Sequence, residues 1–209
     1  MADLSALTTA IEAGDRATAV RTTREAVEEG LDPRTILGAM TVAMEVVGAK
    51  FQCQEIYVPE MLIAARAMKE ATAVLEPVLV KAGIRPEHTA VLGTIKGDLH
   101  DIGKNLVGMM WKGANIDVID LGVNVSAESF VSAVGEHGAE LVGISALLTT
   151  TMVGIKDAVE AIHAAHPTVK VIVGGAPLTP EFAESIGADG FAPDAGSAAQ
   201  VARSAVGMA

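Results

Sequence analysis

The sequence predicts an α/β protein in which a helical N-terminal region precedes a doubly wound parallel sheet. Residues 1–83 carry apolar residues at helical spacing and lack the short apolar runs that are typical of strands. From residue 88 onward such runs alternate with helical stretches, which indicates parallel strands covered on both faces. A proline-containing stretch, residues 83–87, separates the two patterns. We therefore expect two domains, 1–83 and 88–209.

The composition limits the class of protein. Half of the 209 residues are apolar but only 3% are aromatic, so the interior should be aliphatic, with nine methionines contributing. The net charge of −11 argues against a nucleic-acid partner, because backbone phosphates require a basic face. The single cysteine, Cys53, excludes an intrachain disulfide and a cysteine-based metal site.

The sequence shows no sign of a membrane or secretory segment. Its first residues lack the basic and apolar regions of a signal peptide. No window reaches the roughly 18 consecutive apolar residues of a transmembrane helix. We therefore expect a soluble cytoplasmic protein with no membrane partner.

The first three predicted helices are bounded by recognisable caps. The first should end near Gly14, and Asp15 can cap a second helix that runs to Gly30, a residue suited to the position after a helix end. Asp32-Pro33 then supplies an N-cap and a proline in the first turn of the third helix.

A fourth helix completes the N-terminal region. After a polar break at Gln52–Tyr57, Val58-Pro59 opens this helix, and Pro77 should kink or end it. Four helices joined by short links are typical of a small antiparallel bundle.

The C-terminal region should form a five-stranded sheet. We expect strands near Ala90–Ile95, Asp117–Leu121, Leu141–Ile144, Val169–Val173 and Gly190–Ala192. We expect helices near Ile102–Lys112, Ala127–His137, Met152–His166, Pro180–Ile186 and Ala195–Val206. Right-handed crossovers between these strands give a flavodoxin-like, doubly wound domain.

The loop after the first strand is the best candidate for a ligand site. In a parallel sheet the loops that follow the strands gather at one edge, where ligands bind. This loop carries Asp98, His100 and Asp101 among several glycines. An imidazole can bind a transition metal through one nitrogen while the other donates to a carboxylate, a role that Asp98 could fill. Asp101 is a competing partner, but it is also a natural helix N-cap.

His100 has two other interpretations. For an isolated Asp-x-His pattern, a structural histidine in a polar loop is the more common case. A hydrolytic zinc site would need three protein ligands. The remaining histidines are expected away from this edge: His88, His137, His163 and His166. A single histidine instead suggests a metal that is already held by a macrocycle and needs one axial ligand.

The segment Asp98-Leu99-His100-Asp101-Ile102-Gly103 resembles the Asp-x-His-x-x-Gly signature of cobalamin-binding domains. In that family a Ser-x-Leu element and a Gly-Gly pair follow. Here Ser145-Ala146-Leu147 and Gly174-Gly175 follow in the same order and at the family's spacing. The three elements together make the resemblance specific.

The N-terminal helices extend the resemblance over nearly the whole chain. Asp32-Pro33, the run Met44–Gly48 and the stretch Val58–Lys69 are similar to the helical cap of B12-dependent methionine synthase. They are more similar still to the free-standing corrinoid proteins of anaerobic methyltransferase systems.

The resemblance implies a cobalamin whose dimethylbenzimidazole is displaced. His100 would replace it as the lower axial ligand of cobalt, Asp98 would hold the imidazole, and Ser145 would stand behind the pair. When cobalt releases the imidazole beside a carboxylate, the imidazole readily gains a proton, so proton uptake would follow the oxidation state of cobalt.

The resemblance also implies a set of cofactor-binding residues. In the sheet domain these are Gly93, Asp98, Leu99, His100, Asp101, Ile102, Gly103, Ser145, Leu147, Thr149, Thr150, Gly174 and Gly175. A missing Cβ at Gly93, Gly174 and Gly175 would let the nucleotide tail lie against backbone, although tight turns explain such glycines equally well. Tyr57 and Met61 are candidates for the upper cobalt face, beneath a helical lid that excludes water. The alternative for Met61 is the core of the bundle.

The function implied is that of a corrinoid methyl carrier that catalyses little alone. Its partners would be a substrate-specific methyltransferase, a second methyltransferase acting on tetrahydrofolate or a thiol, and a reductive activator of the corrinoid. The alternatives are a cobalamin-binding sensor, a mutase subunit and a phosphoacceptor receiver domain. A sensor of the known kind would add a DNA-binding helix-turn-helix, a mutase subunit would not need this cap, and a receiver would need an acidic pair that Val91–Ile95 does not supply.

Overall fold

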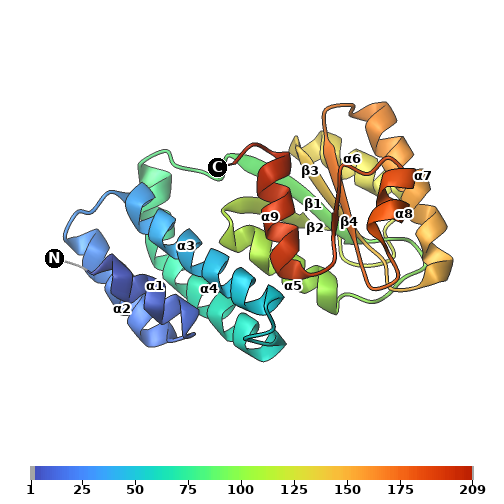
Figure 1. Ribbon diagram of the computed structural model, residues 1–209. Coiled ribbons are helices and arrows are strands. Elements are labelled where there is room, and N and C mark those ends of the chain that lie inside the picture. Colours follow the sequence, from blue (N-terminus) through green and yellow to red (C-terminus); the bar gives the residue numbers. More distant parts are fainter. Residues whose placement is uncertain (1–2, 209) are drawn as a thin grey trace. The chain divides into compact units, whose positions relative to one another are not determined.

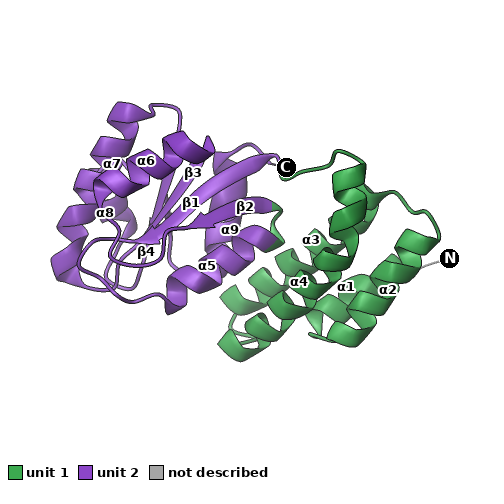
Figure 2. Ribbon diagram, turned by 180° about the vertical axis from the view of Figure 1, so that it is seen from behind, with its two compact units in different colours: residues 1–86, 113–115 green, residues 87–112, 116–209 purple. Residues whose placement is uncertain are grey.

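The computed structural model describes residues 3–208, which form two compact units (Figure 2). The first unit is built from the chain up to Pro86 together with residues 113–115, and the second from residues 87–112 and the chain from 116 onward. No local pattern in the sequence indicates that residues 113–115 group with the helical unit. No helix in the described part of the chain is long and apolar enough to cross a membrane.

The first unit consists of helices, as expected. They are α1 (Leu4–Glu12), α2 (Arg16–Glu28), α3 (Pro33–Gln52) and α4 (Val58–Lys81) (Figure 1). The predicted caps are confirmed, because the Asp15 carboxylate accepts the N–H of Thr18 and the Asp32 carboxylate accepts the N–H of Arg34. Gly30 follows α2 with a φ of 75°, the left-handed conformation that favours glycine.

The fourth helix does not end at Pro77, so of the two expected effects of this proline, a kink or an end, the end was wrong. The helix continues to Lys81. Proline removes one backbone donor from the helix, and Pro77 lies on the exposed side of α4. Leu75 and Leu79 on the opposite side are buried, so the packing of the last turn outweighs the lost hydrogen bond.

The second unit is a five-stranded parallel sheet. Its strands are β1 (His88–Thr94), β2 (Ile116–Asp120), β3 (Leu141–Ser145), β4 (Lys170–Gly174) and β5 (Gly190–Ala192). The strand order is β2-β1-β3-β4-β5, and every neighbouring pair is parallel. This confirms the doubly wound fold. The connections are α5 (Ile102–Gly113), α6 (Ala127–His137), the 3₁₀ turn η1 (Thr149–Thr151), α7 (Met152–Ala165), α8 (Pro180–Ser185) and α9 (Ala195–Ala205).

Helices cover both faces of the sheet (Figure 1). On one face, Phe130 of α6 and Ile155 of α7 pack into a cluster with inward-facing strand residues such as Val142. On the other face, the fully buried Trp111 of α5 donates its indole N–H to the carbonyl of Ala198 in α9, at 2.9 Å. Because helices cover both faces of the sheet, successive residues of a strand are apolar on both sides, and the strands form continuous apolar runs in the sequence.

The strand order places a switch point between β1 and β3. The chain leaves β1 toward β2 on one side and later returns to β3 on the other, so the loops after β1 and β3 diverge from adjacent strand ends. Thr94 is directly opposite Ser145 in the β1–β3 register. The loop that carries Asp98 and His100 is therefore adjacent to the segment that enters α7.

Candidate functional site

The carboxylate of Asp98 joins the two loops at the switch point. Asp98 is fully buried. Its Oδ1 accepts the backbone N–H of His100 at 3.0 Å and lies 2.7 Å from Nδ1 of the same imidazole. Its Oδ2 accepts the N–H groups of Leu147 at 2.7 Å and Leu148 at 3.1 Å. One side chain thus fixes the histidine to the loop after β3.

These hydrogen bonds determine the charge of Asp98. Burial alone raises the pKa of this carboxyl group, but the N–H groups of Leu147 and His100 stabilise the anion and bring the pKa well below its usual range. An ionised carboxylate only accepts hydrogen bonds, so Nδ1 of His100 must donate. In a neutral ring the Nε2 atom then carries the lone pair.

The His100 imidazole is available to a ligand. Its side chain is 52% exposed, although the carboxylate that holds it is completely buried. Nε2 has no hydrogen-bond partner among residues 3–208. The same part of the chain contains no cluster of three His, Cys, Asp or Glu side chains that could hold a metal ion. A metal bound by His100 must therefore bring its other ligands with it.

Thr151, rather than Ser145, stands behind the His100–Asp98 pair. The Thr151 hydroxyl lies 3.2 Å from Oδ2 of Asp98 and 2.8 Å from the carbonyl of Leu148. The Ser145 hydroxyl makes no hydrogen bond in the described structure, and its backbone carbonyl accepts the N–H of Ile95. The 3₁₀ turn after β3 points the third threonine of the run toward Asp98, and the role expected for Ser145 stays a prediction.

Two further residues support the histidine loop, and sequence reasoning missed both. The buried Thr94 donates its hydroxyl to the carbonyl of His100 at 3.0 Å. Asn124, in the loop after β2, accepts the N–H of Gly97 through its side chain and donates its own N–H to the carbonyl of Asp98. Asn124 has a φ of 57°, which asparagine adopts more readily than most residues, so a Gly-x-Asn turn after a strand was the available signal.

Exposed apolar side chains occur in the loops after β1 and β3 and at the start of α7. Leu99 and Ile102 in its own loop are 72% and 74% exposed, and Val153 at the start of α7 is 70% exposed. Leu147 and Leu148, whose N–H groups bind Asp98, also expose their side chains. Water-exposed apolar groups gathered at one edge mark a surface that is covered when a ligand binds.

The glycines divide into two groups. Gly93, Gly174 and Gly175 were expected to leave room for a ligand, but a Cβ at these positions would meet protein atoms: Phe130, the carbonyl of Ala192 and the carbonyl of Ala146, respectively. These glycines permit close packing within the protein, and their contact with a cofactor stays a prediction. At Gly103 no atom lies within 4 Å of the Cβ position, and this glycine keeps the start of α5 open beside His100.

The remaining candidates lie in different settings. Thr149 and Thr150 are exposed in the η1 turn, and Asp101 accepts the side-chain amide of Asn105 at 3.1 Å. In the helical unit Tyr57 is 65% exposed, whereas Met61 is fully buried. The side chain of Tyr57 is therefore accessible, and that of Met61 is not.

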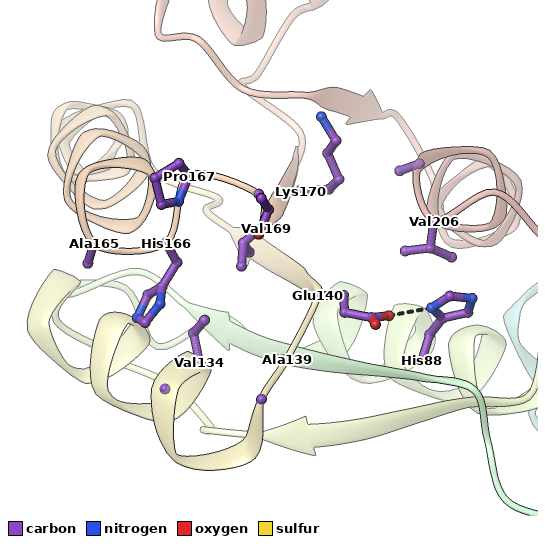
Figure 3. A pocket seen from close by; sticks show the side chains of 14 residues that line it. His88, Val134, Ala139, Glu140, Ala165, His166, Pro167, Val169, Lys170 and Val206 are labelled. Atoms are coloured by element: carbon purple, nitrogen blue, oxygen red, sulfur yellow. Dashed lines mark hydrogen bonds and ion pairs between the residues drawn. The ribbon is translucent and has the colours of Figure 1, made fainter.

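A cavity of about 780 Å³ lies at the opposite edge of the sheet (Figure 3). It is lined by the amino ends of the strands and the carboxyl ends of α6, α7 and α9, and it includes none of the predicted site residues. Its one histidine–carboxylate contact joins Nδ1 of His88 to Glu140. We place the ligand site at the carboxyl edge, because the free imidazole nitrogen and the exposed apolar rim are both found there.

Comparison with known proteins identifies the family. A model of the B12 binding domain matches residues 88–202, and a second B12 binding domain model matches residues 4–76. The chain belongs to the family of B12-binding proteins.

Relatives match the chain over nearly its full length. Corrinoid protein DSY3155 of Desulfitobacterium hafniense is 39% identical over 213 residues, which cover 99% of each chain. Monomethylamine corrinoid protein 2 of Methanosarcina acetivorans is 37% identical and covers 94% of each chain. The methanol:cobalamin methyltransferase complex MtaBC from Methanosarcina barkeri contains a chain with a TM-score of 0.85 and 26% identity, covering 99% of this chain and 80% of that chain.

The residues at the carboxyl edge fit the cofactor of this family. A corrinoid supplies four nitrogen ligands to its metal and leaves an axial position, which matches the single free Nε2 of His100. Its macrocycle is broad and largely apolar at the ring, which matches the rim of Leu99, Ile102 and Val153. The cobalamin predicted from the sequence is therefore the cofactor of this chain.

Proposed function

We propose that this protein is a corrinoid methyl carrier that binds cobalamin base-off, with His100 as the lower axial ligand. It would pass a methyl group from a substrate-specific methyltransferase to a second methyltransferase. The observation that carries the proposal is the His100–Asp98 pair, in which a buried carboxylate holds a half-exposed imidazole with one nitrogen free. When bound, the corrinoid supplies a cobalt centre that accepts and donates the methyl group.

The task of the chain's own residues is to present one nitrogen in a fixed direction. Asp98 selects the tautomer by accepting from Nδ1, and Thr94 holds the backbone of His100 from the other side. Thr151 and the N–H groups of Leu147 and Leu148 keep the carboxylate in place. With the carboxylate anchored from β3, the imidazole needs little reorganisation on binding.

The apolar rim supports the same proposal in a different way. Leu99, Ile102 and Val153 would lose their contact with water beneath a bound macrocycle. Removing apolar area from water contributes about 25 cal/mol per Å², so the rim adds affinity that does not depend on the axial bond. Binding and ligation should therefore be separable by mutation.

The relatives suggest the class of partner. One is named a monomethylamine corrinoid protein, and one solved neighbour is a methanol:cobalamin methyltransferase complex. We propose by this analogy that a methyltransferase specific for a small one-carbon substrate loads the carrier. The acceptor methyltransferase, a reductive activator and a cytoplasmic location stay predictions from the sequence.

Electron paramagnetic resonance of the cobalt(II) form tests the proposal. The protein would be produced with ¹⁵N-histidine and loaded with ordinary cobalamin. We expect nitrogen hyperfine splitting that changes from a triplet to a doublet with the label, because the axial nitrogen belongs to histidine. A triplet that is unchanged in the labelled protein would mean that benzimidazole is the ligand, and the His-on assignment would be abandoned. Methyl transfer with a partner enzyme, absent for a sensor, tests the carrier role.

A further inference from the structure

Lys104 is a buried cation that the site described above does not use. It lies in the first turn of α5 and its side chain is only 2% exposed. Its ammonium lies 2.6 Å from both carboxylate oxygens of Asp120 and 2.8 Å from Oδ1 of Asn105. An ammonium group has three hydrogens, so all of its donors are satisfied. Buried lysines are rare unless paired in this way.

Asp120 is a fixed acceptor at the end of β2. One of its oxygens also accepts the N–H of Gly122 at 2.9 Å. Partial burial raises the pKa of Asp120, but hydrogen bonds from Lys104 and Gly122 outweigh this effect and lower it. The carboxylate is therefore ionised and anchored to the turn that follows the strand.

Asn105 extends the contact toward the histidine. While its Oδ1 accepts from Lys104, its Nδ2 donates to the carboxylate of Asp101 at 3.1 Å. Its backbone N–H also donates to the carbonyl of Asp101 at 2.8 Å. A continuous line of hydrogen bonds thus runs from the end of β2 through Lys104 and Asn105 to the residue directly after His100.

We propose that Lys104 is a positioning residue for the cobalt ligand: bonded to Asp120, it fixes the start of α5 and with it the direction of the His100 imidazole. The proposal rests on the proposed function. The His100 imidazole contacts Asp98, which is anchored to the loop after β3. The next residue along the chain, Asp101, is anchored through Asn105 and Lys104 to the end of β2. An apolar side chain could fill the space of Lys104 at similar stability, but it could not supply three directional bonds.

The test is a methionine in place of Lys104, because methionine preserves the length of the chain and removes the charge. The side chain of Asp120 is 43% exposed and can be hydrated when its partner is lost, so Lys104→Met should fold. The matched control is Lys170→Met, which removes the ion pair of Lys170 with Asp189 at the amino edge of the sheet. Each protein is saturated with cobalamin, and the histidine-ligated fraction is read from the ¹⁵N-histidine cobalt(II) spectrum.

We expect Lys104→Met to lower the histidine-ligated fraction several-fold, while Lys170→Met keeps the wild-type value. An unchanged fraction in folded, saturated Lys104→Met would overturn the proposal. If Lys104→Met does not fold, Asn105→Leu interrupts the same line of hydrogen bonds without leaving a charge unpaired. An Asn105→Leu spectrum identical to that of the wild type would then overturn the proposal. If the wild-type protein itself showed no histidine coupling, the proposed function would fail instead, so the two failures are distinguishable.

Discussion

The two edges of the sheet each hold a histidine–carboxylate pair, but the two pairs are inverted in exposure. At the carboxyl edge the carboxylate of Asp98 is completely buried and the side chain of His100 is 52% exposed. At the amino edge the side chain of Glu140 is 54% exposed and that of His88 only 19%. A ring that faces outward is accessible to a ligand arriving from solvent, so the His100–Asp98 pair is suited to bind one and the His88–Glu140 pair is not.

The direction of the parallel strands explains this inversion. Loops that follow strands lead into helix starts, where backbone N–H groups have no partner within the helix. Leu147 and Leu148, just before η1 and α7, give two such groups to Asp98. The amino edge receives helix carboxyl ends, which offer carbonyls, and Glu140 finds no comparable set of donors among the described residues. Asp98 is therefore completely buried, whereas Glu140 stays exposed.

The largest test of this comparison removes each imidazole in turn. His100→Ala should abolish histidine ligation of cobalt, because the axial nitrogen is lost. His88→Ala should leave ligation at the wild-type level. The measurement is the cobalt(II) spectrum of each loaded protein. Equal effects of the two substitutions on cobalt ligation would show that the two edges do not differ in this function.

The next test removes each carboxylate. Asp98→Ala leaves several buried N–H groups without an acceptor, which should destabilise the protein by about 3 kcal/mol. Glu140→Ala removes an exposed partner and should change stability by less than about 1 kcal/mol. Urea unfolding of the apoproteins measures both values. Similar losses would show that Asp98 is not the anchor described here.

A third test uses acid. The pKa of Asp98 is lowered in the folded protein, whereas the pKa of an aspartate in an unfolded chain is about 3.9. Its stabilising contribution is therefore complete above that value and is lost as the pH falls below it. Each proton taken up on unfolding changes stability by about 1.4 kcal/mol per pH unit. Unfolding measured from pH 5 downward should show a shallower loss in Asp98→Asn than in the wild type; parallel curves would contradict this assignment.

The smallest expected effect compares the two hydroxyls near Asp98. Thr151→Val removes a buried hydroxyl beside the carboxylate and should cost about 1 kcal/mol. Ser145→Ala should stay within about 0.5 kcal/mol, since the Ser145 side chain makes no hydrogen bond in the described structure. Thermal unfolding of the two variants checks which substitution costs more stability. Ser145→Ala would cost more if the Ser145 hydroxyl, rather than that of Thr151, supported the His100–Asp98 pair.

Much of the fold was predictable because its signals are local. Apolar runs and capping residues such as Asp15 and Asp32 located the helices and strands to within about two residues of their observed bounds. Pro77 does not end α4, because the hydrogen bond that proline removes from the helix is outweighed by tertiary packing of the last turn. His100 and Asp98 were identified because they lie two residues apart in one loop.

The rest of the site was hidden because it depends on how separate loops meet. Thr94, Asn124 and Thr151 come from three different segments, and only the converging strand ends bring them to the histidine loop. Nothing in a run of three threonines shows which hydroxyl a 3₁₀ turn directs inward. The packing role of the glycines was hidden for the same reason, because the atoms that crowd Gly93 and Gly175 belong to distant residues.

The buried indole of Trp111 gives the sheet unit an optical signal of its own. The chain contains a single tryptophan, and it lies in the second unit, whereas the only tyrosine, Tyr57, lies in the first. Fluorescence excited at the red edge of the absorption band therefore follows the unfolding of the sheet unit without a contribution from the helical unit. Circular dichroism in the far ultraviolet follows both units together, so a difference between the two curves would report whether the units unfold separately.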